Sequence, residues 1–258
     1  MFDSHCHLDF AAFDDDRDET IARSRRRGVR AIHVPGVGPE QWVSAAALQA
    51  HDGIGSGVGI HPQWLSALSD AELADALDQL APKARELNAE AIGEVGLDAP
   101  TAKRTGPSID AQVAVLDAHL EVARSLELPI VLHVFGPHGR ALEALKRHGP
   151  LVAGGVLHSY SGPAEMVAEY AKLNLFFGFA AAVTRDNARR PLEAARAVPA
   201  ERLMIETDGP DQALTGHERG GPEDLPTICA AVATARGEEV AAVTELTEAN
   251  ARRLFRRA

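Results

Sequence analysis

Short apolar runs alternate with longer amphipathic stretches along almost the whole chain. Runs of this length, rich in apolar and β-branched residues and bounded by polar segments, are typical of strands buried on both faces of a parallel sheet. The predicted strands are residues 1–7, 29–34, 55–60, 91–95, 129–133, 152–158, 173–179 and 202–207.

Between these runs, apolar residues recur every three or four positions, as on one face of a helix. The predicted helices are residues 17–27, 41–51, 70–88, 109–126, 140–148, 164–172, 187–197, 225–235, 240–246 and 248–256. Strands that alternate with helices predict the α/β class and a parallel sheet. We expect this sheet to close into a (β/α)8 TIM barrel, with residues 1–258 forming a single domain.

Composition agrees with an enzyme of one domain. The chain has 258 residues, of which 45% are hydrophobic and 24% charged, as in ordinary globular proteins. The sequence shows neither a membrane-spanning stretch nor a signal peptide, and Cys6 and Cys229 do not make a disulfide framework. We therefore expect a cytoplasmic protein with reduced thiols. We also expect a monomer, because no long apolar surface stretch stands out.

Net charge narrows the possible partners. At −11, the chain does not have the positive charge of a broad, sequence-independent nucleic-acid surface. A small metal site acting on phosphates remains compatible with this value, because bound cations are the largest local charges at such a site.

The first predicted strand contains two histidines one residue apart, His5 and His7. Residues i and i+2 of a strand point to the same face, so the two imidazoles are expected to converge while Cys6 faces the other way. Neutral imidazole is a common ligand of zinc and similar divalent ions. Two hydrogen-bonded core histidines are the alternative for this motif taken alone.

Four further candidate ligands stand at the ends of later apolar runs. They are Glu94, His133, His158 and Asp208. A barrel gathers the carboxyl ends of its strands at one face, where these side chains and the histidine pair would meet. Nitrogen and oxygen donors that converge there predict a metal site.

Six motifs, in this order, resemble the TatD family, which comprises metal-dependent hydrolases of the amidohydrolase superfamily described as deoxyribonucleases. The motifs are HCH at 5–7, GIHP at 59–62, GEVGLD at 93–98, LPIVLH at 128–133, HSYSG at 158–162 and ETDGP at 206–210. The resemblance covers essentially the whole chain, and residues 207–222 are most similar to the YjjV-like bacterial branch.

The resemblance implies a pair of divalent ions. The implied ligands are His5, His7 and Asp208 for one ion, His133 and His158 for the other, and Glu94 between the two. Two such ions lower the pKa of a shared water and bind both the attacked centre and the departing oxygen. The implied nucleophile is a bridging hydroxide, with Asp208 as its orienter or general base and Glu94 setting the spacing. Zinc, manganese, magnesium and iron suit these donors to different degrees.

Residues near the mouth of the barrel are candidate substrate contacts, each with a structural role as the alternative. These are His61, Asp98, Phe135, His138 and Tyr160. Structural roles are expected for His33, His51, His119, His148 and Glu206.

Two departures from the family pattern concern the substrate. The family often has an arginine two residues after the fifth-strand histidine, well placed to meet a phosphate, and Phe135 stands there instead. The family also tends to carry an aromatic pair after Gly-Leu-Asp, whereas residues 99–107 are polar and expected to be mobile. Charge that could replace the arginine is expected from loop residues Lys103, Arg104, Arg185 or Arg219.

Three functions remain open from the sequence. The first is a two-metal phosphodiesterase, a deoxyribonuclease acting on DNA ends, single-stranded DNA or a small phosphodiester. The second is a hydrolase of a small-molecule ester or amide, because the same barrel and ligands serve that chemistry. The third is a non-catalytic metal-binding protein that retains the scaffold.

Overall fold

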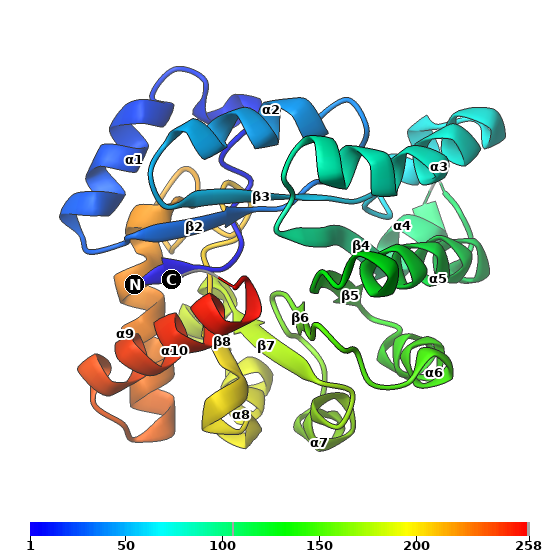
Figure 1. Cartoon of the computed structure of the whole chain (residues 1–258). Coiled ribbons are helices and arrows are strands. Elements are labelled where there is room, and N and C mark those ends of the chain that lie inside the picture. Colours follow the sequence, from blue (N-terminus) through cyan, green and yellow to red (C-terminus); the bar gives the residue numbers. More distant parts are fainter. Residues whose placement is uncertain (105, 257–258) are drawn as a thin grey trace.

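Eight parallel strands form one sheet in chain order in the computed structural model, which describes residues 1–104 and 106–256 (Figure 1). The strands are β1 (Phe2–Asp3), β2 (Ala31–Val34), β3 (Ile54–Val58), β4 (Ala91–Asp98), β5 (Ile130–Phe135), β6 (Gly155–Leu157), β7 (Leu175–Phe179) and β8 (Leu203–Ile205). Beyond the paired strands, the amide of Ser4 donates to the carbonyl of Ile205 at 3.2 Å. This bond brings the two ends of the sheet together, and the predicted (β/α)8 barrel is confirmed.

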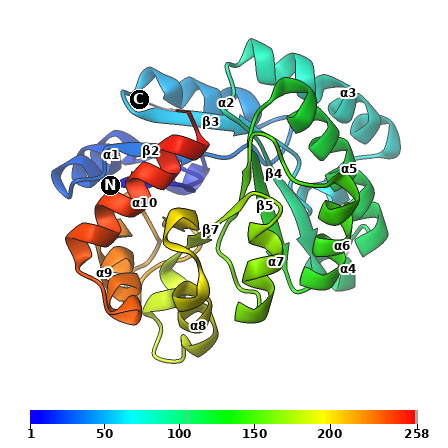
Figure 2. The ribbon, with the colours of Figure 1, turned by 60° about the horizontal axis from the view of Figure 1, so that its bottom comes forward.

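Helices surround the strands, as both ribbon views show (Figures 1 and 2). They are α1 (Arg17–Arg26), α2 (Trp42–Ala47), α3 (Asp70–Glu86), α4 (Ala99–Arg104), α5 (Ile109–Leu126), α6 (His138–His148), α7 (Val167–Ala171), α8 (Arg189–Ala197), α9 (Leu225–Arg236) and α10 (Val240–Leu254). None of the helices in the described part of the chain is both long and apolar enough to cross a membrane.

An apolar layer fills the amino-terminal end of the barrel. It takes inward-facing residues from most strands, such as Phe2, Val131 and Met204, and α10 adds Leu254 together with the following Phe255. The rings of Phe2 and Phe255 stack with centroids 5.5 Å apart. Because α10 covers this end, the barrel opens to solvent at its opposite, carboxyl-terminal end.

The first and last strands are shorter than predicted. β1 ends at Asp3 and β8 at Ile205, so His5, His7 and Asp208 lie in the loops that follow. The amide of His7 donates to the carbonyl of Gly209 at 2.8 Å, and the amide of Asp208 to the carbonyl of His5 at 2.9 Å. Contact between these two loops, rather than the alternation of a strand, therefore sets the direction of the histidine pair.

Two further predictions were wrong. The polar stretch 99–107, expected to be mobile, forms helix α4 over Ala99–Arg104, while Thr105 lies outside the described residues. Its start is fixed because the amide of Thr101 donates to Asp98 Oδ1 at 2.6 Å. The two predicted terminal helices are one continuous helix, α10, since no residue near position 247 interrupts the backbone bonding.

His119 has the structural role that its position on α5 predicts. Its Nδ1 donates to the carbonyl of Val115 at 2.8 Å, and its Nε2 accepts from the amide of Ile60 at 3.1 Å. The ring is fully buried, and this burial lowers its pKa to about 4. A proton on Nε2 would remove the acceptor for Ile60, so the neutral ring is the one that fits.

We predict that His119→Ala lowers the free energy of unfolding by about 2–4 kcal/mol near pH 7, because it leaves a buried amide unpaired and a cavity behind. The pKa of His119 is lower in the folded than in the unfolded chain, so its contribution is complete above pH 6.5. As the pH falls toward 4, this contribution is lost, and the free energy of unfolding falls by about 3 kcal/mol. Urea unfolding between pH 7 and 4.5 should therefore show a shallower pH dependence in the variant.

The matched control is His51→Ala, which removes a half-exposed imidazole. It should leave the free energy of unfolding at pH 7 close to that of the unsubstituted protein. Equal slopes in His119→Ala and the unsubstituted protein would contradict the assigned role.

Candidate metal centre

Imidazoles and carboxylates from six strands converge at the carboxyl-terminal end of the barrel. They are His5 and His7 after β1, His61 after β3, Glu94 in β4, His133 in β5, His158 after β6 and Asp208 after β8. Except for His133, which is partly exposed, all of them are at least nine-tenths buried. The structure thus brings together the six ligands predicted from the sequence and adds His61.

An irregularity in β4 turns Glu94 into the barrel. The pairing of β4 with β5 shifts between Ile92 and Val95, which leaves Glu94 out of the regular ladder. Gly93 has a φ of +128°, and a Cβ at this position would lie 2.4 Å from the carbonyl oxygen of Val131. Only glycine fits this conformation and this close approach, so Gly93 is what allows the next residue to reach the centre.

One oxygen of Glu94 faces the histidine pair. Its Oε2 lies 3.2 Å from His5 Nε2 and 3.4 Å from His7 Nε2, and these two nitrogens are 3.2 Å apart. Asp208 Oδ1 lies 3.6 Å from His5 Nε2 and 3.8 Å from His7 Nε2. These four side chains form the first donor group.

The other oxygen of Glu94 faces a second set of imidazoles. Its Oε1 lies 2.8 Å from His158 Nε2, 3.0 Å from His133 Nδ1 and 3.3 Å from His61 Nε2. The facing nitrogens of His133 and His158 are 3.0 Å apart. Glu94 is therefore shared between two donor groups, as a bridging carboxylate would be.

The spacing of these donors fits divalent ions. Metal–ligand bonds of about 2.1 Å place neighbouring ligands about 3.0–3.5 Å apart in octahedral or tetrahedral geometry. The donor pairs around both oxygens of Glu94 fall in or close to this range. Protons alone satisfy such a cluster poorly, since Nε2 of His5 and of His7 face both each other and the same carboxylate oxygen. A cation can accept the lone pairs of all three atoms at once.

Burial and mutual charge set the protonation of the cluster. Burial lowers the pKa of His5 to about 3 and that of His7 well below its usual range, so both rings are neutral and offer lone pairs. Burial works against the charge of Glu94, but facing imidazoles, above all His158, hold its pKa well below the usual range. The pKa of His158 is raised well above its usual value, since Glu94 and Asp208 outweigh its burial.

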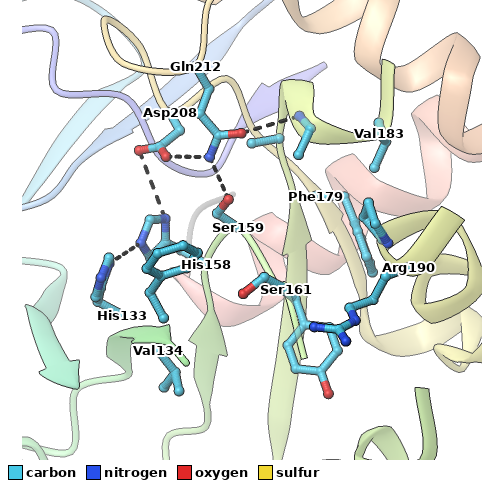
Figure 3. Close-up of a pocket in the computed structure, with 15 residues that line it drawn as sticks. His133, Val134, His158, Ser159, Ser161, Phe179, Val183, Arg190, Asp208 and Gln212 are labelled. Carbon is cyan, nitrogen blue, oxygen red and sulfur yellow. Dashed lines mark hydrogen bonds and ion pairs between the residues drawn. The ribbon is translucent and has the colours of Figure 1, made fainter. Parts of the chain in front are cut away.

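Asp208 differs from Glu94 in its electrostatics. Burial raises its pKa to about 7, and the nearby charge of Glu94 acts in the same direction. Its Oδ2 accepts from Gln212 Nε2 at 2.7 Å, which leaves Oδ1 turned toward the histidine pair. The same amide nitrogen of Gln212 donates to Ser159 Oγ at 2.5 Å (Figure 3). Sequence reasoning missed Gln212, which lies in an irregular loop without a periodic pattern.

Other polar groups orient the histidines from behind. Asp98 Oδ2 lies 3.1 Å from His133 Nε2, which leaves Nδ1 of that ring for Glu94. Asp98 was predicted as a substrate contact or as a residue that orients a ligand, and the structure places it against His133 and the start of α4. Glu206 is fully buried, accepts from the Ser159 amide at 2.5 Å and lies 3.5 Å from His158 Nδ1, consistent with its predicted structural role.

Two cavities open on either side of the cluster, and His133, His158 and Asp208 line both. The first has a volume of about 400 Å³ and includes Phe135 and Tyr160 in its wall (Figure 3). The second has a volume of about 270 Å³ and is lined, among others, by His61, Phe10 and Trp64. Three of the predicted substrate contacts, Phe135, Tyr160 and His61, therefore face a cavity.

His138 does not line either cavity. Its ring packs 5.4 Å from that of Tyr160, centroid to centroid, and its carbonyl accepts from Tyr170 Oη at 2.8 Å. His138, the first residue of α6, therefore lies behind the part of the wall that Tyr160 forms.

The loop cations proposed from the sequence also lie away from the cavities. Arg219 pairs with Asp16 at 2.5 Å, and Arg185 donates to the carbonyl of Ala213 at 2.9 Å. Lys103 and Arg104 are exposed on α4 and line neither cavity. The basic residue that does line the first cavity is Arg190, near the start of α8, which sequence reasoning missed.

Comparison with known proteins gives a consistent result. The family described as TatD related DNase matches residues 2–256. The 3'-5' ssDNA/RNA exonuclease TatD of Klebsiella pneumoniae (strain 342) is 36% identical, over 99% of this chain and 97% of that protein. The uncharacterized metal-dependent hydrolase YabD of Bacillus subtilis (strain 168) is 31% identical, over 99% of each.

Among solved structures, the fold is similar to that of YjjV, a TatD homologue from Escherichia coli K12. The TM-score is 0.90 at 28% identity, over 100% of this chain and 98% of that one. Family pattern, relatives and fold agree over the whole length of the barrel. The chain therefore belongs to the TatD related DNase family, whose relatives include metal-dependent hydrolases.

Proposed function

We propose that this protein is a divalent-metal-dependent phosphodiesterase that removes nucleotides from the ends of single-stranded DNA or RNA. The observation that carries this proposal is the sharing of the buried Glu94 carboxylate between two donor groups at the mouth of the barrel. The 36% identity to an exonuclease of single-stranded DNA and RNA supports the choice of substrate.

The two donor groups would hold one ion each. The proposed ligands are His5, His7 and Asp208 for the first ion, His133 and His158 for the second, and Glu94 for both. His61 Nε2 faces the same oxygen of Glu94 as the second group and is a further candidate ligand there. When bound, zinc, manganese, magnesium or iron would supply Lewis acidity, activating water and neutralising charge on the phosphate.

Asp208 is placed to accept a proton from the attacking water. Its Oδ1 faces the cluster while Gln212 holds Oδ2, so the free oxygen has a fixed direction. Attack of water on phosphorus breaks the bond to the neighbouring nucleotide oxygen. One proton of the water passes to the carboxylate of Asp208 and from there to the departing oxygen, which leaves as a hydroxyl. Glu94, with its lowered pKa, stays ionised and keeps the imidazoles facing one another.

Aromatic rings on both sides of the cluster suit nucleobases. Phe10 stacks on His7 with ring centroids 4.6 Å apart and lies 5.9 Å from Trp64 on the side of the second cavity. Phe135, with 52% of its surface exposed, lines the first cavity. Bases stack on such rings without regard to sequence, which single-strand binding requires. The phenylalanine at 135 therefore offers stacking where the family often has an arginine.

We predict that Glu94→Ala and Asp208→Ala each lower hydrolysis of single-stranded DNA at least about 1,000-fold, because each removes a shared ligand or the proton acceptor. The measurement uses metal-stripped protein reloaded with each candidate ion, against single-stranded DNA, a small phosphodiester, and a panel of esters and amides. Asp186→Ala, on an exposed loop, is the control and should retain full activity.

The substrate panel separates the remaining functions. Cleavage of esters or amides alone would replace the phosphodiesterase with a small-molecule hydrolase on the same site. A protein that binds metal and turns over none of the substrates would be a binding protein. Unchanged DNA hydrolysis in either alanine variant would contradict the assigned site.

The affinity of the protein for metal tests whether Asp98 holds His133 in place. We predict that Asp98→Asn weakens binding of the ion nearest His133 about 10- to 100-fold, because the ring loses the carboxylate that holds its Nε2. Titration of metal-free protein by calorimetry measures this directly. Asp117→Asn, which alters an outer ion pair with Arg147, should bind as the unsubstituted protein does, and equal affinity in Asp98→Asn would refute the role.

A further inference from the structure

We propose that Arg190 binds a second phosphate of the substrate, one nucleotide away from the bond cleaved at the cluster. The sugar and base of the intervening nucleotide would occupy the first cavity, between the cluster and Arg190. This inference rests on the proposed function, because it takes the scissile phosphodiester to lie at Glu94 and its surrounding histidines.

The first cavity is apolar between two polar ends. His133, His158 and Asp208 lie on one side and Arg190 on the other (Figure 3). Apolar and aromatic side chains line the space between them, namely Val134, Phe135, Tyr160, Phe179 and Val183. A volume of about 400 Å³ lies within the range of sites that enclose small organic ligands. The cavity thus fits a molecule with an apolar body and a polar group at each end.

Arg190 has no polar partner among the residues that the structure describes. In residues 1–104 and 106–256, its guanidinium forms no hydrogen bond or ion pair with any side chain or carbonyl. Arg189, its neighbour on α8, pairs instead with Glu193 at 2.9 Å. Of the described residues that line the two cavities, Arg190 alone is a lysine or arginine. An unpaired cation at the end of an apolar cavity is free to bind an anion of the ligand.

The guanidinium end of Arg190 extends toward Ser161, which lines the same cavity (Figure 3). His138 lies behind this wall, and its Nε2 is buried without a hydrogen-bond partner in the described part of the chain. Burial, followed by the charge of Arg190, lowers the pKa of His138 to about 4. The far end of the cavity therefore combines a fixed positive charge with the hydroxyl of Ser161.

A phosphate is the anion that this arrangement favours in a nucleic acid. Guanidinium groups bind phosphate through two parallel hydrogen bonds, and the backbone of a strand repeats the phosphate at every nucleotide. With one phosphate at the cluster, the next one along the strand, or a terminal phosphate, would reach Arg190 across one sugar and base. Arg190 would thereby supply the phosphate contact that Phe135 cannot make.

Binding of thymidine 3',5'-bisphosphate tests the proposal without turnover, since this ligand has no phosphodiester to cleave. In calorimetry with metal-loaded protein, we expect it to bind about 10- to 100-fold more tightly than thymidine 5'-monophosphate. Arg190→Gln should abolish this difference, and Arg189→Gln should retain it. Equal binding of the two nucleotides, or a difference that persists in Arg190→Gln, would overturn the proposal.

Three dinucleotides identify where the second phosphate lies. TpT has only the scissile phosphate, TpTp adds one at the 3' end, and pTpT adds one at the 5' end. Preference for TpTp or for pTpT over TpT, lost in Arg190→Gln through a higher KM, supports the proposal and tells which side Arg190 serves. Equal cleavage of all three would overturn it. Failure of the unsubstituted protein to cleave any phosphodiester would instead reject the proposed function, whatever the binding data show.

Discussion

The carboxylate of Glu94 is the charge around which the mouth of the barrel is organised. It is 1% exposed, and a buried ion is tolerated only where opposite charge or hydrogen bonds replace water. Imidazole nitrogens from β5 and from the loops after β1, β3 and β6 lie within 3.4 Å of its two oxygens and meet this requirement. Their number exceeds what one carboxylate needs for hydrogen bonding, and this excess of donors is what fits the cluster to divalent ions.

The two ends of the barrel differ in the side chains that fill them. At the amino-terminal end, apolar side chains pack against α10, and the stacked rings of Phe2 and Phe255 close the interior. At the other end, polar side chains come from β4 and β5 and from the loops that follow the other strands. Where these two parts of the barrel meet, the backbone of β4 is irregular, and Gly93 lies close to β5. A regular strand would leave Glu94 in the ladder.

The proposed metal ligands and the proposed substrate contacts lie in different parts of the site. Buried carboxylates and amides, such as Asp98, Glu206 and Gln212, hold the inner groups in place from behind. Beyond them, aromatic and aliphatic side chains such as Phe135 and Val183 form much of the wall of the first cavity. An exposed residue such as Phe135 can therefore differ from the family pattern while the cluster keeps its geometry, since nothing in the cluster packs against it for orientation.

The sequence by itself determined the barrel and the six candidate ligands, because apolar periodicity reports burial and strand order places every carboxyl end at one face. It also predicted the structural role of His119. Only the tertiary structure decided the rest. His61 joins the cluster, Asp98 lies against His133, and Arg190 lines a cavity that the loop cations expected from the sequence do not line. These outcomes depend on how loops from distant strands pack together, and local sequence patterns hold no information on that packing.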